Sequence, residues 1–83
     1  LKVDLIKVDG QFIKGMLRDA LDDASVRGFL EVARVLGVQT VAEFVDDEAV
    51  LARVRELGFD FAQGFHIARP QPLQACAADA AAG

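Results

Sequence analysis

The sequence contains almost no cysteine or histidine, and this limits the kinds of site it can build. Its 83 residues include one Cys and one His. Cys76 alone can form neither an internal disulfide nor a cysteine-based zinc site. With a single His66, any metal site must rely mostly on carboxylates, which suit Mg²⁺, Mn²⁺ or Ca²⁺.

Long apolar runs and an excess of basic charge are also missing. No run approaches the roughly 20 apolar residues that cross a bilayer, so we expect no membrane contact by this segment. The net charge is −4, whereas a protein that binds nucleic-acid polymers carries a basic face. What remains, 53% hydrophobic and 27% charged residues, is typical of one globular domain with a thin core.

The two ends differ in character from the middle. The chain opens inside an apolar run without an initiator Met, which favours a segment cut from a longer protein. Residues 74–83 are nearly all alanine, and we expect this tail to be poorly ordered. The predicted domain therefore covers residues 1–73.

Strand-like and helix-like patterns alternate between the ends. The expected strands are Leu5–Val8, Thr40–Val45 and Phe59–Phe65. The expected helices run from Asp22 or Asp23 to Leu36, capped by Asp22, Asp23 or Ser25 and ended by Gly37, and from Asp46–Glu48 to Gly58. Asp9 and Gly10 are expected to form a turn, and Arg69–Pro72 to break regular structure. This order predicts an α/β fold with parallel strands, cut from a larger barrel or doubly wound sheet.

Polar side chains lie near the carboxyl ends of all three expected strands. Lys7 and Asp9 are two residues apart and share one face of the first strand. Glu43 and Gln63 occupy equivalent places on the second and third. Strand interiors normally exclude such residues, so the pattern predicts a shared site at the carboxyl ends, where barrels and open α/β sheets place their active sites.

Three motifs in these segments resemble EAL-type cyclic-di-GMP phosphodiesterases. Asp4–Asp9 resembles their D-x-L/I-K-I/V-D strand. Leu36–Gly37 followed by Thr40–Asp46 resembles their L-G and V-A-E-G/F-V-E segments. Leu57–Phe65, followed by Arg69–Pro70, resembles L-G-x-D-x-x-Q-G-Y/F and the later basic residue and proline. Together they identify residues 1–73 as the C-terminal portion of an EAL domain, which implies the last three strand–helix units of a (β/α)8 TIM-type barrel.

The resemblance implies a bacterial signalling enzyme that hydrolyses cyclic di-GMP to the linear dinucleotide. Two cations, Mg²⁺ or Mn²⁺, would act in the complete domain. That domain is expected to be cytoplasmic, in a parent that other domains could anchor to a membrane. The E-A-L signature, an Asn and a Glu ligand and the D-D-F-G aspartates belong to earlier strands and are not in this sequence. We therefore expect this fragment to be inactive without its partner, the rest of the EAL barrel.

Matching positions suggest catalytic and metal-binding roles for three residues. Lys7 matches the lysine that holds or activates the attacking water; without the resemblance it reads as a strand residue in a salt bridge or reaching for solvent. Asp9 matches a metal-site aspartate, or is a turn residue before Gly10. Glu43 matches the carboxylate that binds a metal or its water, and otherwise is a solvent-facing charge at a strand end.

Three further positions concern the substrate and the surroundings of the site. Gln63 matches a glutamine near the substrate phosphate or metal waters, or forms hydrogen bonds at the barrel rim. Phe44 replaces a glycine found in many members, and its ring would narrow the mouth or stack on guanine. Asp46 stands where many members have Glu; it would support the site, or cap the following helix. His66 is read as a loop residue and Cys76 as an incidental thiol.

Two other functions remain as alternatives. A degenerate EAL domain would bind cyclic di-GMP without hydrolysing it; the presence of both Lys7 and Glu43 favours an active parent. A two-component receiver domain would need an acidic pair on early strands and a late Lys, and the order here is reversed.

We also expect the fragment to self-associate. The outer edges of its first and third strands would be unpaired, and one sheet face would be open to water. The expected members of that open face are Ile6, Val8, Val41 or Ala42, and Phe61.

Overall fold

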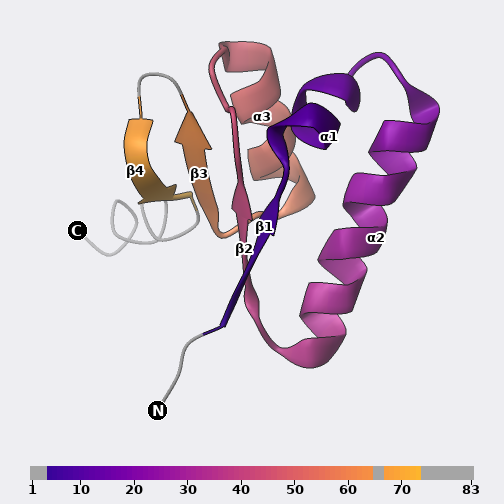
Figure 1. Ribbon diagram of the computed structural model, residues 1–83, viewed down its shortest axis with the longest axis vertical. Coiled ribbons are helices and arrows are strands. Elements are labelled where there is room, and N and C mark those ends of the chain that lie inside the picture. The colour runs from indigo at the N-terminus through magenta and orange to yellow at the C-terminus, as the bar shows by residue number, and fades with distance from the viewer. Residues whose placement is uncertain (1–3, 65–66, 74–83) are drawn as a thin grey trace.

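The computed structural model describes residues 4–64 and 67–73 (Figure 1). The elements in chain order are β1 (Leu5–Val8), α1 (Gly10–Gly15), α2 (Ala20–Leu36), β2 (Gln39–Ala42), α3 (Glu48–Leu57), β3 (Phe61–Gly64) and β4 (Ile67–Pro72). The expectations for His66, Cys76 and residues 74–83 lie outside the described residues. Among the described helices, none has the length and apolar character needed to cross a membrane.

The strands form one sheet in the order β1-β2-β3-β4. The predicted parallel pairing is confirmed for β1 with β2 and for β2 with β3. The prediction that Arg69–Pro72 breaks regular structure is wrong, because β4 pairs antiparallel with β3. Proline is tolerated there because β4 is an edge strand. The outer edge of β3 is therefore covered, contrary to the expectation that it would be free.

A short helix replaces the turn expected at Asp9 and Gly10. The carboxylate of Asp9 accepts a hydrogen bond from the backbone N–H of Gln11 at 2.8 Å, which makes Asp9 the N-cap of α1. This bond satisfies one of the N–H groups that a helix start leaves without a partner. With six residues, α1 is too short to show an apolar period in the sequence.

The long helix α2 begins earlier than predicted and ends where predicted. Asp19 is its N-cap and accepts from the N–H of Leu21 at 2.9 Å, so the expected caps Asp22, Asp23 and Ser25 are wrong. Asp22 and Asp23 instead lie in the first turn, where acidic groups stabilise the helix dipole. Gly37 ends the helix with a φ of 71°, a conformation that favours glycine.

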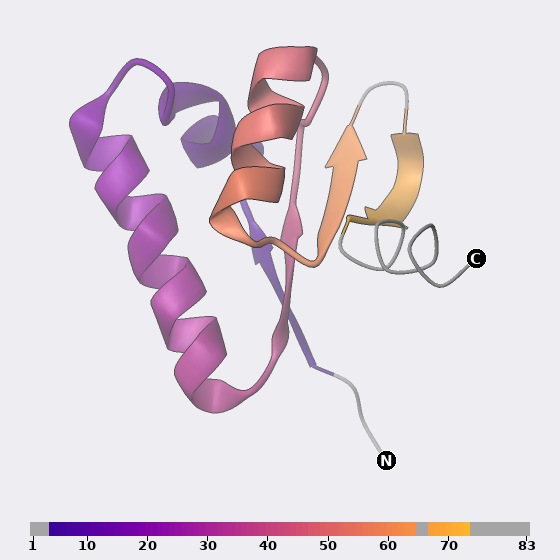
Figure 2. The same ribbon diagram turned by 180° about the vertical axis from the view of Figure 1, so that it is seen from behind.

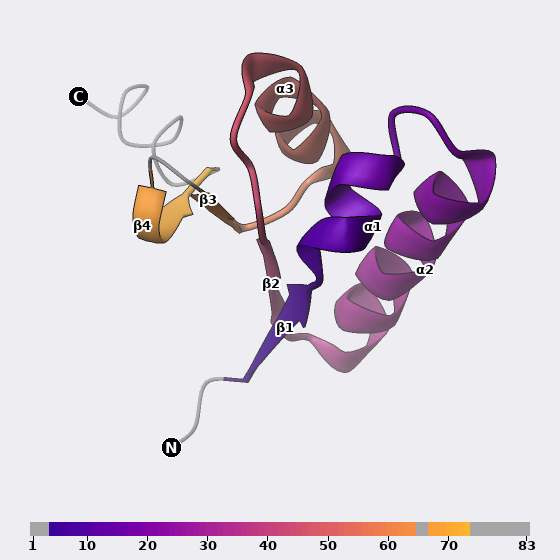
Figure 3. The same cartoon turned by 45° about the horizontal axis from the view of Figure 1, so that its top comes forward.

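All three helices lie along one side of the sheet (Figure 3). The core between the layers contains Val8, Ile13, Met16, Val26, Ala42, Val45, Val50, Val54, Phe59, Ala62 and Leu73, with Ile6 packed against it. Ile6, Val8 and Ala42 thus face the helices, and their expected place on an open sheet face is wrong. Val41 and Phe61 occupy the alternate positions, and Val41 is fully buried.

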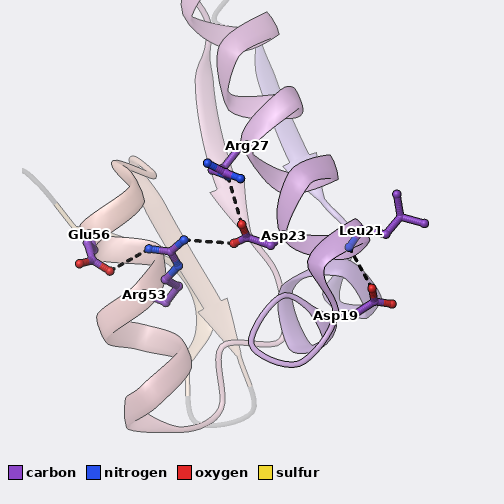
Figure 4. A network of polar contacts seen from close by, with 6 residues as sticks. All are labelled: Asp19, Leu21, Asp23, Arg27, Arg53 and Glu56. Carbon is purple, nitrogen blue, oxygen red and sulfur yellow. Dashed lines mark hydrogen bonds and ion pairs between the residues drawn. The ribbon is translucent and has the colours of Figure 1, made fainter.

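An arginine joins α2 to α3, which are at the left and the upper centre of the view from behind (Figure 2). Arg53 of α3 donates to Asp23 of α2 at 3.1 Å and to Glu56 at 3.0 Å, and Arg27 also pairs with Asp23 at 3.1 Å (Figure 4). The hydrogen bonds to Asp23 and Glu56 raise the pKa of Arg53. This network fixes the spacing of the two helices behind the sheet.

Candidate functional site

The carboxyl ends of β1, β2 and β3 point to the same edge of the sheet, the upper end in Figure 1. The last paired row across these strands consists of Val8, Ala42 and Ala62. The next residues in each chain segment are Asp9, Glu43 and Gln63, three of the positions selected from the sequence. The parallel register therefore brings one polar residue from each strand to this edge.

Two backbone hydrogen bonds hold the segment after β2 against its neighbours. The N–H of Glu43 donates to the carbonyl of Val8 at 3.2 Å, and the N–H of Val45 donates to the carbonyl of Gln63 at 2.9 Å. Gly64 permits this second approach, because a Cβ at that position would overlap the backbone carbonyl of Val45. The segment from Glu43 to Val45 is consequently held through the main chain to Val8 on one side and to Gln63 on the other.

A hollow of about 380 Å³ opens at this edge. Its lining residues are Lys14, Glu43, Phe44, Asp46, Gln63 and Gly64. Glu43 and Gln63 are half-buried, so their polar groups are partly withdrawn from water while still reachable. Four residues that the sequence singled out separately thus line one depression.

Lys7 and Asp9 are not among the residues that line this hollow. Lys7 is exposed and pairs in register with Val41, one row before the strand ends. Asp9 is exposed and uses its carboxylate to cap α1. The alternation of β1 put both on one face, but the helix that starts at Gly10 turns the chain at Asp9.

A larger hollow of about 440 Å³ lies between α2 and α3 on one side and the start of β2 on the other. Its polar groups already have partners within the chain: Asp60 accepts from the backbone N–H of Thr40 at 2.8 Å, and Arg34 pairs with Glu31. Barrels place their chemistry at the opposite, carboxyl end of the strands. We therefore assign this second hollow to the scaffold.

Phe44 has an unusual backbone and a well-defined side-chain environment. Its φ is 60°, in the left-handed region that glycine adopts readily and other residues rarely do. A glycine, the residue that the EAL resemblance leads one to expect here, would adopt this conformation without strain. The Phe44 ring lies against Gly10, where a Cβ would overlap it, and 56% of the residue remains exposed.

Asp46 does not cap α3, so that interpretation is wrong. The cap is Asp47, whose carboxylate accepts from the N–H of Val50 at 2.8 Å. Asp46 instead forms an ion pair with Lys14 of α1 at 3.7 Å. The Nζ of Lys14 also lies 5.6 Å from the centroid of the Phe44 ring.

Sequence reasoning missed Lys14 entirely. Its position has meaning only once α1 exists, because the helix carries it to the segment after β2. One signal in the sequence could have indicated it. Lys14 lies five residues after Asp9, a potential N-cap, and would fall within the first one and a half turns of a helix that begins there.

The described residues do not form a complete metal site by themselves. A carboxylate at Glu43 beside an amide oxygen at Gln63 is an oxygen donor set that suits Mg²⁺ or Mn²⁺. Within residues 4–64 and 67–73, however, no group of three or more His, Cys, Asp or Glu side chains is close enough to hold an ion. A complete site would need ligands from outside this part of the chain.

Comparison with known sequences connects these features to one family. The EAL domain model matches residues 1–70. The cyclic di-GMP phosphodiesterase PdeB of Shewanella oneidensis is 45% identical over 73 residues, covering 88% of this chain and 8% of PdeB. PdeF of Escherichia coli, also named a cyclic di-GMP phosphodiesterase, is 38% identical over 73 residues, covering 88% of this chain and 10% of PdeF. The chain thus spans about a tenth of these relatives.

Solved structures give the same answer for the fold. The PaMucR phosphodiesterase in complex with c-di-GMP superposes with a TM-score of 0.74 at 33% identity, covering 92% of this chain and 31% of that one. The EAL domain of Mycobacterium smegmatis DcpA gives 0.71 at 30% identity, covering 100% and 37%. The α/β fold with three parallel strands is that of part of a TIM-type EAL barrel. The chain belongs to the EAL domain family.

Proposed function

We propose that this chain forms the part of an EAL barrel that contributes Glu43 and Gln63 to the hydrolysis of cyclic di-GMP. The observation that carries the proposal is the hollow at the carboxyl ends of the strands, lined by Glu43, Phe44 and Gln63. Relatives named cyclic di-GMP phosphodiesterases support the choice of substrate. The reaction breaks one phosphodiester bond with water and leaves the linear dinucleotide.

The chain would supply acidic and basic groups to this reaction, and the rest of the barrel the remaining metal ligands. When bound, two Mg²⁺ or Mn²⁺ ions would acidify the attacking water and neutralise the scissile phosphate. Glu43 is the carboxylate this chain offers to them. The Oδ1 of Asp9 accepts from the N–H of Gln11, so Asp9 would join the ligands through its other carboxylate oxygen. Lys7, exposed one row below, would orient the water through its ammonium group.

Two residues would hold the dinucleotide itself. The exposed ring of Phe44 offers a flat surface on which a guanine base can stack. Gln63, half-buried and on the next strand, presents an amide that can donate to a phosphate oxygen or accept from a base. A hollow of about 380 Å³ is at the small end of ligand pockets, so it would take one part of the substrate, with the remaining barrel enclosing the rest.

The partner of this chain is the remainder of the EAL barrel. Within the described sheet, β1 is paired on one side only, by β2, which leaves its other edge for a preceding strand. Exposed apolar side chains on α2 add surface that is costly to leave in water: Leu21, Phe29, Val32, Val35 and Leu36. Where the remaining barrel is absent, we expect copies of this chain to cover these groups by self-association.

The test places residues 1–73 in a complete barrel. A chimera would carry them in place of the matching segment of Shewanella PdeB, the 45% identical relative. With Mg²⁺ or Mn²⁺ present, we expect chromatography to show conversion of cyclic di-GMP to the linear dinucleotide, abolished by EDTA. The isolated 83-residue chain under the same conditions should give no product.

Two results would overturn the proposal. A folded chimera that binds cyclic di-GMP without cleaving it would favour the non-hydrolytic receptor. A folded chimera that neither binds nor cleaves it would remove the assigned substrate. Circular dichroism and a cooperative melting transition establish folding in each case.

A further inference from the structure

Lys14 is the only cation among the residues that line the hollow at the described strand ends. We propose that Lys14 is a positioning residue that holds the Phe44 ring as a stacking platform and so sets the affinity for a guanine base. The substrate named in this inference rests on the proposed function. The second test below needs no substrate and does not depend on that function. Lys14 lies on the helix α1, outside the three strand motifs, so the inference adds a new residue to the site.

The contacts of Lys14 connect α1 to both ends of a short segment. Its Nζ lies 5.6 Å from the Phe44 ring centroid and 3.7 Å from Oδ2 of Asp46. An ammonium at that distance from a ring is attracted by the negative face of the aromatic system. Phe44 and Asp46 are the first and third residues after Glu43, so Lys14 contacts the segment that carries the proposed metal ligand.

The helix beneath Lys14 is itself firmly placed. Ile13 is fully buried in the core and Met16 is 5% exposed, and these neighbours fix α1 against the sheet. The Asp9 cap fixes its first turn. The side chain of Lys14 is 54% exposed, so its packing contributes little to this core. Its role is therefore better explained by what its ammonium touches.

The Phe44 ring needs contacts from other residues to keep one orientation, because its own backbone conformation does not hold it in place. A φ of 60° is strained for any residue with a Cβ, and more than half of the residue is exposed. Gly10 lies against one part of the Phe44 ring, and the charged ammonium group of Lys14 lies near the same ring. Asp46 keeps that charge in place by pairing with it. A ring held in one orientation binds a base with a smaller loss of rotamer entropy than a freely rotating ring.

The competing role, direct contact between Lys14 and a substrate phosphate, makes a different prediction. A direct contact would matter whether or not Phe44 is present. A positioning role through Phe44 disappears when the ring is removed. A double-mutant cycle therefore separates the two.

The kinetic test uses the PdeB chimera. Lys14→Met should raise KM for cyclic di-GMP about 3- to 10-fold, the size of an exposed cation–π contact and ion pair together, with kcat within twofold. Lys14→Arg should restore KM, since guanidinium groups also lie over aromatic rings. In a Phe44→Ala background, Lys14→Met should have no further effect. Arg18→Met, an exposed residue outside the hollow, removes the same charge as a control and should leave KM unchanged.

An unchanged KM in Lys14→Met would overturn the inference, and so would an equal rise in KM with and without Phe44. The second test needs no substrate and uses the 83-residue chain. Phe44→Ala should move the Lys14 ε-methylene proton resonances downfield by removing the ring current, and Arg18 resonances should not move. Unmoved Lys14 resonances would refute the contact. An inactive, non-binding wild-type chimera would instead refute the proposed function, while the resonances still decide on the contact.

Discussion

Replacing Gly64 by Ala tests the close backbone approach on which the hollow depends. A Cβ at residue 64 would overlap the carbonyl oxygen and carbon of Val45. Neither is the movable end of a side chain, so the segment after β2 must shift away from β3. The hydrogen bond from the N–H of Val45 to the carbonyl of Gln63, now 2.9 Å, would lengthen or break. The change is one methyl group, and no charge is altered.

The expected cost combines two effects. Forcing a methyl group into a filled space typically costs about 1–3 kcal/mol, and losing one backbone hydrogen bond adds about 0.5–1.5 kcal/mol. Gly64→Ala should thus lower the free energy of unfolding by about 2–4 kcal/mol. For a domain of this size that corresponds to a fall in Tm of at least about 10 °C.

Gly28→Ala is the matched control. Gly28 lies inside α2, and a Cβ there would meet no atom within 4 Å. The same methyl group should therefore raise the free energy of unfolding by about 0.5–1 kcal/mol, because alanine favours a helix interior more than glycine does. The two variants share one chemical change and have opposite expected signs.

Thermal and urea unfolding followed by circular dichroism measure both effects, and hydrogen exchange at the Val45 amide reports on the affected bond. We expect faster exchange at Val45 in Gly64→Ala and unchanged exchange in Gly28→Ala. If Gly64→Ala melts within about 2 °C of the wild type while Gly28→Ala is stabilised, the close approach of the two segments is not as described.

Three other predictions concern catalysis and assembly. In the PdeB chimera, Glu43→Gln should lower kcat about 100-fold or more, since it removes a charged ligand. Lys7→Ala should lower kcat with little change in KM, and near-wild-type rates in both variants would show that these roles are misplaced. By sedimentation velocity, the 83-residue chain should associate at micromolar concentration, and Leu21→Glu with Val35→Glu should shift it toward monomer. A compact wild-type monomer would contradict the expected self-association.

Much of the scaffold could be predicted because its signals are local. Gly37 and Gly58 end α2 and α3 with φ values of 71° and 93°, where glycine is favoured, and both ends were read from the sequence. The alternation of strands with helices long enough for a crossover required parallel pairing, and β1, β2 and β3 pair that way. These features depend on single residues or on runs of regular period.

Other parts depend on tertiary context and could not be predicted. The prolines of β4 argue against a strand by themselves, and only the free edge of β3 makes one possible there. The N-cap of α2 is Asp19, which precedes the first buried residue of the helix, Val26, by seven positions, so the apolar period did not extend to the cap. Several nearby acidic residues could each cap a helix, so the sequence alone did not choose among them.

The candidate site shows the same division. Glu43 and Gln63 were found because parallel strands that end together deliver their next residues to one edge, and this follows from the order of the strands alone. Asp9 also follows directly after its strand, but its carboxylate accepts a hydrogen bond from the first turn of the helix that begins after it. Lys14 reaches the hollow through that helix. A helix too short to be seen in the sequence therefore decides which polar residues line the hollow, exchanging an expected aspartate for an unexpected lysine.

That exchange alters the electrostatic character of the hollow by placing one cation among its lining residues. With Asp9 turned to the α1 cap, the acidic lining groups are Glu43 and Asp46, and Lys14 lies 3.7 Å from the second of these. The same ammonium lies 5.6 Å from the Phe44 ring centroid, so its contacts include Asp46 and Phe44. Glu43 is left as the carboxylate of the lining that Lys14 does not neutralise, which is the arrangement that a cation-binding role for Glu43 requires.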